Sequence, residues 1–288
     1  MTSPRVLLSA WKIRAKKQLG QTFLSDPSTA AMIAARSGIS ADDVVLEIGA
    51  GLGAITIPVA RIARTIYAVE IDSKLIGLLK NELLTESVTN VVLMEKNILH
   101  LDIPELSERL RRKIIVMGNL PYNISSQILV KLINSRSGIS RAILMFQKEL
   151  AQRIAAQPGC KDYGRLTVML KYCADLKTLA TVDAAKFFPK PKVDSEVIEI
   201  RFTSSLKNRA NDEQFLFRVI KAAFGRRRKT LKNALAGSEL RITTDDVLRA
   251  LDLAGIDPIR RAETLKVSEF VTLSNCLENI LPSGNQSR

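Results

Sequence analysis

Five short apolar runs separated by amphipathic segments constrain the fold of this chain more than any other feature. The runs are rich in β-branched residues and apolar at almost every position, as strands buried on both faces of a parallel sheet must be. The segments between them begin near Ala54, Ser73 and Ser125 with helical spacing, and Ser73 and Ser125 are the predicted N-caps. The alternation predicts an α/β fold with five parallel strands. The predicted strands are Val44 to Ile48, Thr65 to Glu70, Val91 to Glu95, Ile114 to Gly118 and Arg141 to Phe146.

The pattern changes after the fifth strand. Leu166 to Cys173 and Ser195 to Phe202 resemble strands joined by a proline-containing loop, which predicts an antiparallel hairpin that completes the sheet. Beyond about Ser204 the spacing is wholly helical, so we expect two domains, residues 1–204 and a small all-helical domain of residues 205–288. The predicted helices there are Asp212 to Phe224, Arg228 to Leu235, Asp245 to Ala254 and Val267 to Leu281.

The composition favours a globular protein that binds nucleic acid. Of 288 residues, 46% are hydrophobic, which is enough for a sizeable core. Lys and Arg number 43 against 29 Asp and Glu, a net charge of +14 that is typical of a phosphate-backbone binder. No apolar stretch has the length of a signal peptide or membrane span, so we expect a cytoplasmic protein without membrane association. Nothing in the sequence suggests an obligate partner, so we also expect a monomer.

Residues that could bind a metal are sparse. Cys160, Cys173 and Cys276 lack the close paired spacing of a zinc or redox site and are expected to be free thiols. The single histidine, His100, follows the third predicted strand and is expected to have a local structural role. We therefore expect no metal.

A glycine-rich turn follows the first strand and opens a helix. In Glu47-Ile48-Gly49-Ala50-Gly51-Leu52-Gly53 the glycines permit a tight turn and close approach of the backbone to a nucleoside ligand. Glu70 ends the second strand, where a carboxylate can accept hydrogen bonds from ribose hydroxyls. The two features predict a nucleoside-containing cofactor, but they do not choose between S-adenosylmethionine and NAD. A turn that binds nothing is the remaining alternative.

A polar and aromatic motif follows the fourth strand. In Gly118-Asn119-Leu120-Pro121-Tyr122 the Asn119 side-chain oxygen and the Leu120 carbonyl can accept both hydrogens of an adenine amine. That would turn the nitrogen lone pair toward a cofactor methyl group and stabilise the transition state. Pro121 stiffens the turn, and Tyr122 offers a face for an extruded base. The motif predicts methyl transfer to adenine, with a simple turn as the alternative.

At these residues the sequence resembles the ribosomal RNA adenine dimethyltransferase family of the small subunit. The resemblance extends almost end to end: beyond the two motifs above it includes Leu19 to Leu24, Tyr163 to Leu166, Phe187 to Ser195 and Arg227 to Leu231. It implies a Rossmann-like class I methyltransferase sheet that binds S-adenosylmethionine, with dimethylation of adjacent adenines in a 3′-terminal hairpin loop of 16S-type RNA. It also implies a role in small-subunit biogenesis.

The resemblance assigns roles to individual residues. Thr22 and Leu24 would close over the cofactor, Gly49, Gly51 and Glu70 would hold it, and Asn97 would contact its adenine. Asn119 would serve both cofactor and acceptor, and Phe187 would stack against the flipped base, with Phe188 in its place if the register differs by one. The sequence departs from the family pattern at Thr22 and Asn97, which affects the expected cofactor affinity.

A basic cluster in the helical domain is the predicted RNA contact. It surrounds Phe224 and Gly225 at a helix break and suits recognition of RNA by shape and backbone. A solvated helix face is the alternative. The cluster consists of Lys221, Arg226, Arg227, Arg228, Lys229 and Lys232.

Three rival functions remain open. The enzyme rivals are a large-subunit RNA dimethyltransferase and a DNA adenine methyltransferase, which more often carry Ile and Pro respectively at the position of Leu120. The third is a non-catalytic RNA-binding assembly factor of the same fold. The complete acceptor motif favours catalysis over that last reading.

Overall fold

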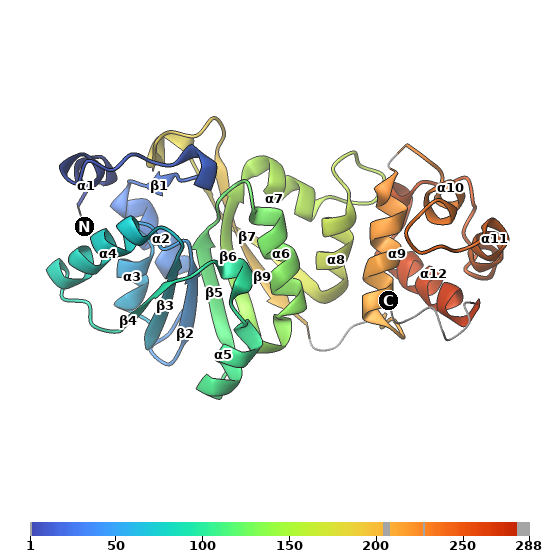
Figure 1. Ribbon diagram of the computed structural model, residues 1–288, viewed down its shortest axis with the longest axis horizontal. Helices are drawn as coiled ribbons and strands as arrows, with labels where there is room; N and C mark the ends of the chain where they lie inside the picture. The colour runs from blue at the N-terminus through green and yellow to red at the C-terminus, as the bar shows by residue number, and fades with distance from the viewer. Residues whose placement is uncertain (1, 204–207, 227, 281–288) are drawn as a thin grey trace. The chain divides into compact units, whose positions relative to one another are not determined.

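A seven-stranded sheet forms the centre of the first of two units (Figure 1). The computed structural model describes residues 2–203, 208–226 and 228–280. The strand order is β4-β3-β2-β5-β6-β9-β7, and every neighbouring pair among β2 to β6 is parallel. The five predicted parallel strands are therefore confirmed. They are β2 (Val44–Ile48), β3 (Thr65–Glu70), β4 (Val91–Glu95), β5 (Ile114–Asn119) and β6 (Ile139–Gln147).

The far edge of the sheet differs from the prediction in one element. β9 (Ser195–Phe202), which was predicted as a strand, lies antiparallel to β6, and β7 (Ala174–Val182) lies beyond β9. The segment predicted as the first hairpin strand, Leu166 to Cys173, is instead part of helix α8 (Arg165–Cys173). Six of the nine residues of α8 are buried, so the segment is buried over most of its surface and its periodicity does not distinguish a strand from a buried helix.

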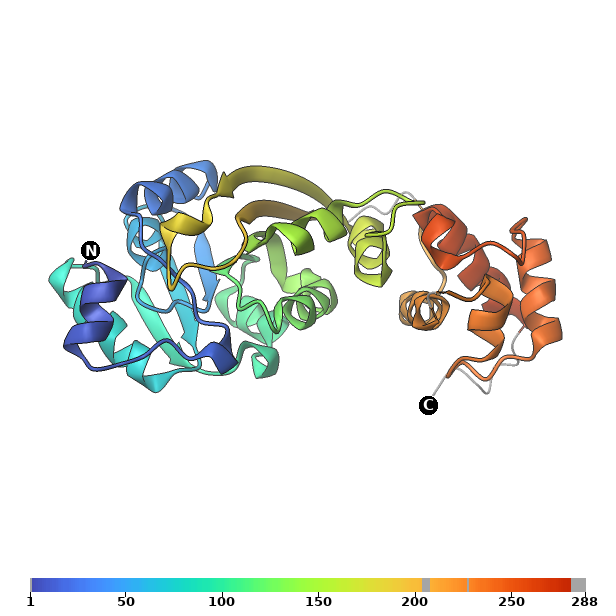
Figure 2. The ribbon, with the colours of Figure 1, turned by 90° about the horizontal axis from the view of Figure 1, so that it is seen from above.

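Helices cover both faces of the sheet (Figure 2). On one face, α2 (Pro27–Arg36), α3 (Thr56–Ala60) and α4 (Ser73–Thr85) share a hydrophobic core with alternate strand residues. Side chains alternate along a strand, so Leu46 and Val116 point to the opposite face, and both are fully buried. The remaining helices of the unit are α5 (Ile103–Leu110) and α6 (Ser125–Asn134), and α7 (Lys148–Ala155) begins in it.

The predicted N-caps of α4 and α6 are each one residue too late. Asp72, not Ser73, caps α4, because its carboxylate accepts a hydrogen bond from the Lys74 backbone N–H. Ile124 precedes α6 without a side-chain cap, and the Ser125 hydroxyl donates to the Pro121 carbonyl. Ser125 therefore fixes the loop after β5 to the first turn of α6.

The N-terminal segment packs onto the same unit. Helix α1 (Pro4–Ala10) buries Leu7 and Leu8 in a small core with α4. After a 3-10 turn, η1 (Lys17–Leu19), the chain forms β1 (Phe23–Leu24), which pairs antiparallel with β8 (Phe187–Phe188). The start of the chain is thereby joined to the segment between β7 and β9.

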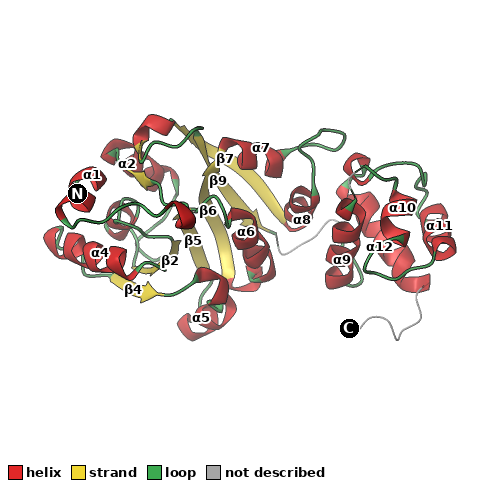
Figure 3. Cartoon of the chain, turned by 45° about the horizontal axis from the view of Figure 1, so that its top comes forward, coloured by secondary structure: helices red, strands yellow, loops and turns green. Residues whose placement is uncertain are grey.

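The second unit is helical, as Figure 3 shows by colour. Its helices after residue 204 were all predicted from the sequence, within a few residues at their ends. Tyr163, Phe224 and Phe270 pack against one another in its interior. The elements after α8 are α9 (Glu213–Gly225), α10 (Leu231–Ala236), α11 (Thr244–Leu253), the 3-10 turn η5 (Ala262–Thr264) and α12 (Val267–Ile280).

The division into units adds a segment to the predicted helical domain. The first unit consists of Met1–Ala151 and Asp175–Phe202, and the second of Gln152–Ala174 and Thr203–Arg288. Gln152–Ala174 belongs to the second unit because α8 packs on α9 and α12. The predicted boundary at residues 204/205 itself lies outside the described residues.

Two expectations about the whole chain can be compared with the structure. The three cysteines, all in the described part of the chain, form no disulfide; Cys173 is buried and the other two are partly exposed. No helix in the described part of the chain combines the length and apolar character needed to cross a membrane.

Gly118 permits the close approach of β5 to β2, and its replacement should destabilise the fold. An added Cβ would overlap the Ile48 carbonyl oxygen, so we expect Gly118→Ala to lower the free energy of unfolding by about 1–3 kcal/mol or more. The control is Gly77→Ala in α4, where a Cβ meets nothing within 4 Å and alanine should add about 0.5–1 kcal/mol. Urea unfolding measures both. Equal stability of the two variants would contradict this packing.

Candidate functional site

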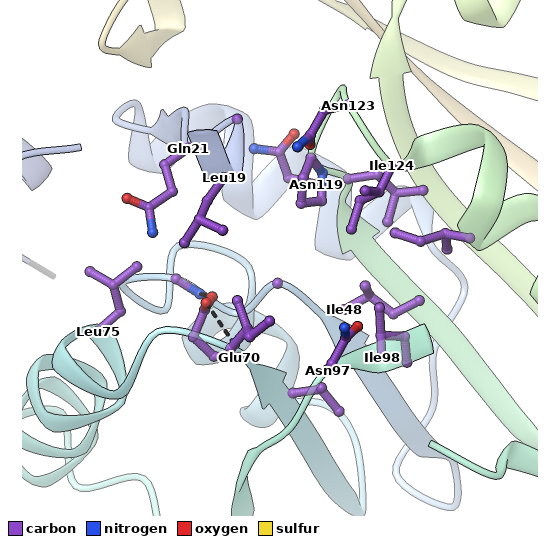
Figure 4. Close-up of a pocket in the computed structure, with 18 of the residues that line it drawn as sticks. Leu19, Gln21, Ile48, Glu70, Leu75, Asn97, Ile98, Asn119, Asn123 and Ile124 are labelled. Carbon is purple, nitrogen blue, oxygen red and sulfur yellow. Dashed lines mark hydrogen bonds between the residues drawn. The ribbon is translucent and has the colours of Figure 1, made fainter. Parts of the chain in front are cut away.

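A cavity of about 210 Å³ lies at the carboxyl ends of β2, β3 and β5. This edge of an open parallel sheet is where α/β proteins bind ligands. Glu70 and Asn97 lie on one side of the cavity, and Asn119 and Asn123 on the other (Figure 4). The structure brings eight of the residues predicted from the sequence together in its lining. They are Thr22, Gly49, Gly51, Glu70, Asn97, Asn119, Leu120 and Pro121.

The glycine turn places backbone directly against this cavity. Gly49 and Gly51 have φ angles of 72° and 55°, in the left-handed region that other residues rarely adopt. A Cβ on Gly51 would lie 3.4 Å from the Phe23 ring, so a side chain there would crowd the segment that closes the cavity. The turn is held to β3 by hydrogen bonds from the Gly49 and Ala50 N–H groups to the Val69 carbonyl.

Glu70 is held rigidly at the end of β3. One carboxylate oxygen accepts the Gly51 N–H at 3.0 Å, and the other accepts the N–H groups of Ile71 and Asp72 at 2.9 Å. Burial raises the pKa of Glu70, while these hydrogen bonds lower it in part. A carboxylate has about four lone-pair sites, so with three in use it can still accept a hydrogen bond from a ligand in the cavity.

The Asn119 side chain has a defined orientation at the end of β5. Its Nδ2 donates to the Thr22 carbonyl at 2.9 Å, and because a carbonyl only accepts, the amide oxygen must face away from Thr22. That oxygen, Oδ1, is buried and has no hydrogen-bond partner. A buried, unpaired acceptor is costly, which favours a donor on a ligand as its partner.

Asn97 lies across the cavity from Asn119. Its side-chain oxygen accepts the Leu99 N–H at 3.0 Å and so caps the 3-10 turn η2 (Ile98–His100). The oxygen retains a second lone pair, and the amide nitrogen is a further donor. Asn97 can therefore both donate hydrogen bonds to a purine edge and accept one from it, although one lone pair of its oxygen is used by the turn.

A polar network that the sequence reading did not identify fastens the segment over the cavity. The buried Asp72 carboxylate accepts from Lys16 Nζ at 2.8 Å and Gln21 Nε2 at 3.1 Å. On the other side, Asn123 Nδ2 donates to the Gln18 carbonyl at 2.9 Å. The N-cap role of Asp72 could have been predicted from the sequence, because this residue stands directly before Ser73 at a helix start. Its long-range partners could not have been predicted.

Three predicted residues lie outside the main cavity. Leu24 lines a smaller adjoining hollow together with Thr22 and Asn119. The half-buried Tyr122 has its hydroxyl 3.5 Å from Thr22 Oγ1. Phe187 is only 3% exposed and belongs to the core, paired with Leu24 across β1 and β8. Its neighbour Phe188 keeps partial exposure.

Glu47 is a buried carboxyl group in the same adjoining hollow. It precedes Gly49 in β2, is 3% exposed, and its Oε2 has no hydrogen-bond partner. Burial, with a smaller contribution from the charge of Glu70, raises the pKa of Glu47 to about 8. The side chain is therefore mostly protonated at neutral pH.

The basic cluster lies in the second unit, at the break between α9 and α10. Arg226, Arg228 and Lys229 are exposed, and Lys232 is half-buried. Lys221 forms an exposed ion pair of 2.7 Å with Glu239, which reduces its free charge. Arg227 lies outside the described residues. The described cations thus gather on one short stretch of chain.

Metal binding has no candidate site among the residues described. No group of three or more His, Cys, Asp or Glu side chains could hold an ion in that part of the chain. His100 is exposed at the end of η2, away from the predicted acceptor motif in sequence.

Comparison with known sequences gives a consistent family. The model of the family described as "Ribosomal RNA adenine dimethylase" matches residues 12–279. A protein named "Ribosomal RNA small subunit methyltransferase A" from Desulforapulum autotrophicum is 54% identical over 277 residues, covering 96% of this chain and 97% of the relative. A protein of the same name from Clostridium botulinum is 38% identical and covers 96% of this chain and 98% of the relative.

Solved structures of similar fold include two RNA-modifying enzymes. A dimethyladenosine transferase from Plasmodium falciparum has a TM-score of 0.71 and 26% identity, covering 87% of this chain and 95% of that one. The 23S rRNA methyltransferase ErmE has a TM-score of 0.64 and 26% identity, covering 89% and 99%.

The raised pKa of Glu47 predicts a loss of stability with rising pH. An unfolded glutamate ionises near pH 4.3, whereas the folded protein keeps the proton up to about pH 8. Between these values only the unfolded state loses the proton, so the free energy of unfolding falls as pH rises. Glu47→Gln cannot ionise and should lose less stability between pH 6 and pH 8.5, measured by urea unfolding. The exposed Glu108→Gln is the control. The same pH dependence in wild type and Glu47→Gln would contradict the assignment.

Proposed function

Because the chain belongs to the ribosomal RNA adenine dimethylase family, we propose that it transfers methyl groups from S-adenosylmethionine to adenine amines of small-subunit ribosomal RNA. In the finer proposal, two adjacent adenines in a 3′-terminal hairpin loop each receive two methyl groups, during small-subunit biogenesis. The observation that carries the proposal is the buried, unpaired Oδ1 of Asn119 at a cavity that Glu70 also lines. The first unit would be catalytic and the second would bind RNA.

The lining residues fit a nucleoside cofactor. Glu70 would accept the ribose hydroxyls, the Gly49 and Gly51 backbone would lie against the amino-acid end, and Asn97 would contact the adenine edge. Thr22 and Leu24 would cover the cofactor as part of the segment fastened by Asp72. When bound, S-adenosylmethionine supplies a methyl group on a positively charged sulfur, which is a good leaving group.

The acceptor residues address the weak nucleophilicity of adenine. Its amino lone pair is delocalised into the ring, so the nitrogen must become tetrahedral before it can attack. Asn119 Oδ1 and the Leu120 carbonyl would accept the two amino hydrogens and favour that geometry. Pro121 limits the motion of this turn, and the Ser125 hydroxyl holds the Pro121 carbonyl at 2.7 Å. Alignment of nitrogen and methyl group then supplies much of the rate acceleration.

Stacking of the extruded base is assigned chiefly to Tyr122. Its ring is half-buried beside Thr22, at the end of the acceptor motif. Phe187 stays a predicted stacking residue that would have to leave the core, since it is 3% exposed, while the adjacent Phe188 is already partly accessible. Phe187 and Phe188 both lie in β8, which pairs with β1, and β1 begins directly after Thr22.

The exposed cations of the second unit suit a phosphate backbone. Arg226, Arg228 and Lys229 are exposed, and Arg227 stands between them in sequence. Their proposed role is to bind structured RNA through its backbone, which gives affinity without base recognition.

The large-subunit alternative is favoured by one observation, the similarity of the fold to ErmE. The small subunit is favoured by the names of relatives at 54% and 38% identity over nearly the whole chain. Transfer of labelled methyl groups to separated, unmethylated ribosomal subunits tests the choice. We expect dimethyladenosine in small-subunit RNA. Labelling of large subunits or of DNA instead would refute the substrate assignment.

Two substitutions should separate the acceptor from the cofactor site. Asn119→Ala removes the unpaired acceptor and also the bond to the Thr22 carbonyl, so turnover should fall about 100-fold or more while cofactor affinity measured by calorimetry falls much less. Glu70→Ala removes a charged hydrogen-bond acceptor and should weaken cofactor binding about tenfold with RNA affinity unchanged. Glu70→Gln, which preserves shape, is the milder control. Loss of cofactor binding in Asn119→Ala equal to its loss of turnover would reassign Asn119.

A further inference from the structure

The first 25 residues carry an unusually one-sided charge. They contain Arg5, Lys12, Arg14, Lys16 and Lys17, and no Asp or Glu precedes Asp26. Among the described residues, Lys12 and Arg14 form no ion pair, and both are exposed. The proposed methyl transfer uses this segment from Lys16 onward, through the pair of Lys16 with Asp72 and the cavity lining, and it assigns no role to Trp11, Lys12 or Arg14.

The backbone arranges these cations in a row. Residues 13–16 follow α1 without regular secondary structure, and their exposure alternates with a period of two. Ile13 and Ala15 pack against the small core that contains Leu7 and Leu8, whereas Lys12 and Arg14 are exposed. The apolar residues therefore act as anchors that present a line of positive charge.

Trp11 stands at the start of this row with 53% of its surface exposed. Tryptophan side chains are normally well buried, so hydrophobic burial does not explain the presence of this residue at the end of α1. The charged residue Lys12 follows it directly, with a φ of 54° that turns the chain out of the helix. An exposed aromatic ring beside free cations is the composition of a single-stranded nucleic-acid platform.

Both ends of this stretch are fixed to the catalytic unit. Thr2 bonds to the Glu82 carboxylate through its backbone N–H and its hydroxyl, at 3.0 Å each, and Lys16 pairs with Asp72 at 2.8 Å. The chain then continues directly into Leu19 to Phe23, which line the cavity. In Figure 1 this dark blue chain runs from α1 past β1. The platform is thus preformed and covalently continuous with the cavity lining.

We propose that Trp11, Lys12 and Arg14 bind the unpaired RNA strand that flanks the target adenine, with a base stacked on Trp11 and phosphates on the two cations. The inference rests on the proposed function and adds an RNA surface on the catalytic unit. A hairpin loop offers unpaired bases for stacking, and extrusion of the target adenine frees its neighbours further. The positive charge suits any polyanion, but the exposed Trp11 ring favours RNA over an acidic protein, because a base can stack on the ring and a carboxylate side chain cannot.

Trp11 is the only tryptophan in the chain, so its fluorescence reports directly on this surface. The full-length protein is titrated with a synthetic hairpin RNA that carries two adjacent loop adenines, and with the polyanion heparin as a comparison. Stacking should quench the emission in proportion to RNA occupancy and protect the ring from acrylamide. Heparin should bind with much less quenching. RNA binding without quenching or protection would overturn the proposal.

Substitutions test the same surface through affinity. Trp11→Ala should raise the dissociation constant for the hairpin at least about fivefold, whereas Trp11→Phe, which keeps a stacking ring, should stay within about twofold of wild type. The double variant Lys12→Glu with Arg14→Glu should weaken binding and flatten its dependence on salt. All three sites are exposed, and unchanged cofactor affinity confirms that the variants are folded.

Two controls match these changes elsewhere on the unit. Leu84→Ala removes another exposed apolar side chain, 70% accessible, and Lys113→Glu reverses an exposed charge at the opposite end of β5 from the cavity. Both should leave hairpin affinity near that of the wild type. The proposal would be overturned if Lys113→Glu weakened hairpin binding as much as the double variant does, or if Trp11→Ala bound the hairpin as tightly as the wild type. In either case, methyl transfer by the wild-type protein to small subunits would still support the proposed function. A wild-type protein that neither binds the hairpin nor methylates small subunits would overturn both.

Discussion

The hydrogen bond from Asn119 Nδ2 to the Thr22 carbonyl decides which chemical group faces the cavity. It uses the donor end of the amide, so the acceptor end stays buried and unpaired at the end of β5. Leaving such an oxygen without a partner has a cost of about 1–3 kcal/mol, and a ligand that donates a hydrogen bond recovers it. The same bond joins the N-terminal segment to the sheet across 97 residues of sequence, so the cover of the cavity and its acceptor are set together.

The rest of the first unit positions this pair of residues. The order β3-β2-β5 places Glu70, the glycine turn and Asn119 at neighbouring strand ends, and Gly118 lets β5 approach β2 closely. Asp72 extends the arrangement, since one carboxylate caps α4 and holds both Lys16 and Gln21. A change at Asp72 would therefore affect a helix start and the cover of the cavity at once.

Much of this arrangement follows from local sequence. The five parallel strands were predictable because burial on both faces demands uninterrupted apolar runs, and the glycine turn, Glu70 and the Asn119 motif follow directly from strand ends. Six of the eight predicted residues in the cavity lining follow for that reason, whereas Thr22 and Asn97 were assigned from the family resemblance. Leu166 to Cys173 was wrongly predicted as a strand because its environment in the second unit buries most of its surface, and packing against α9 and α12, not periodicity, determines its helix.

Contacts between distant segments could not be read from the sequence. The bonds of Asp72 to Gln21 and of Asn123 to Gln18 span 51 and 105 residues, and no local pattern specifies such partners. Phe187 is a case in which the local motif suggested a position that a long-range contact changes. Its motif identified it as a residue near the base, whereas the pairing of β8 with β1 places its ring in the core. The buried state of Glu47 likewise arises from three-dimensional packing around β2.

The most direct measurement is a crystal structure of the protein with an unreactive S-adenosylmethionine analogue and an adenine-containing hairpin. We expect the adenine amino nitrogen within about 2.7–3.2 Å of both Asn119 Oδ1 and the Leu120 carbonyl, and about 3–3.5 Å from the position of the transferred group. An adenine bound elsewhere, or an Asn119 oxygen that accepts its hydrogen bond from the cofactor alone, would contradict this expectation.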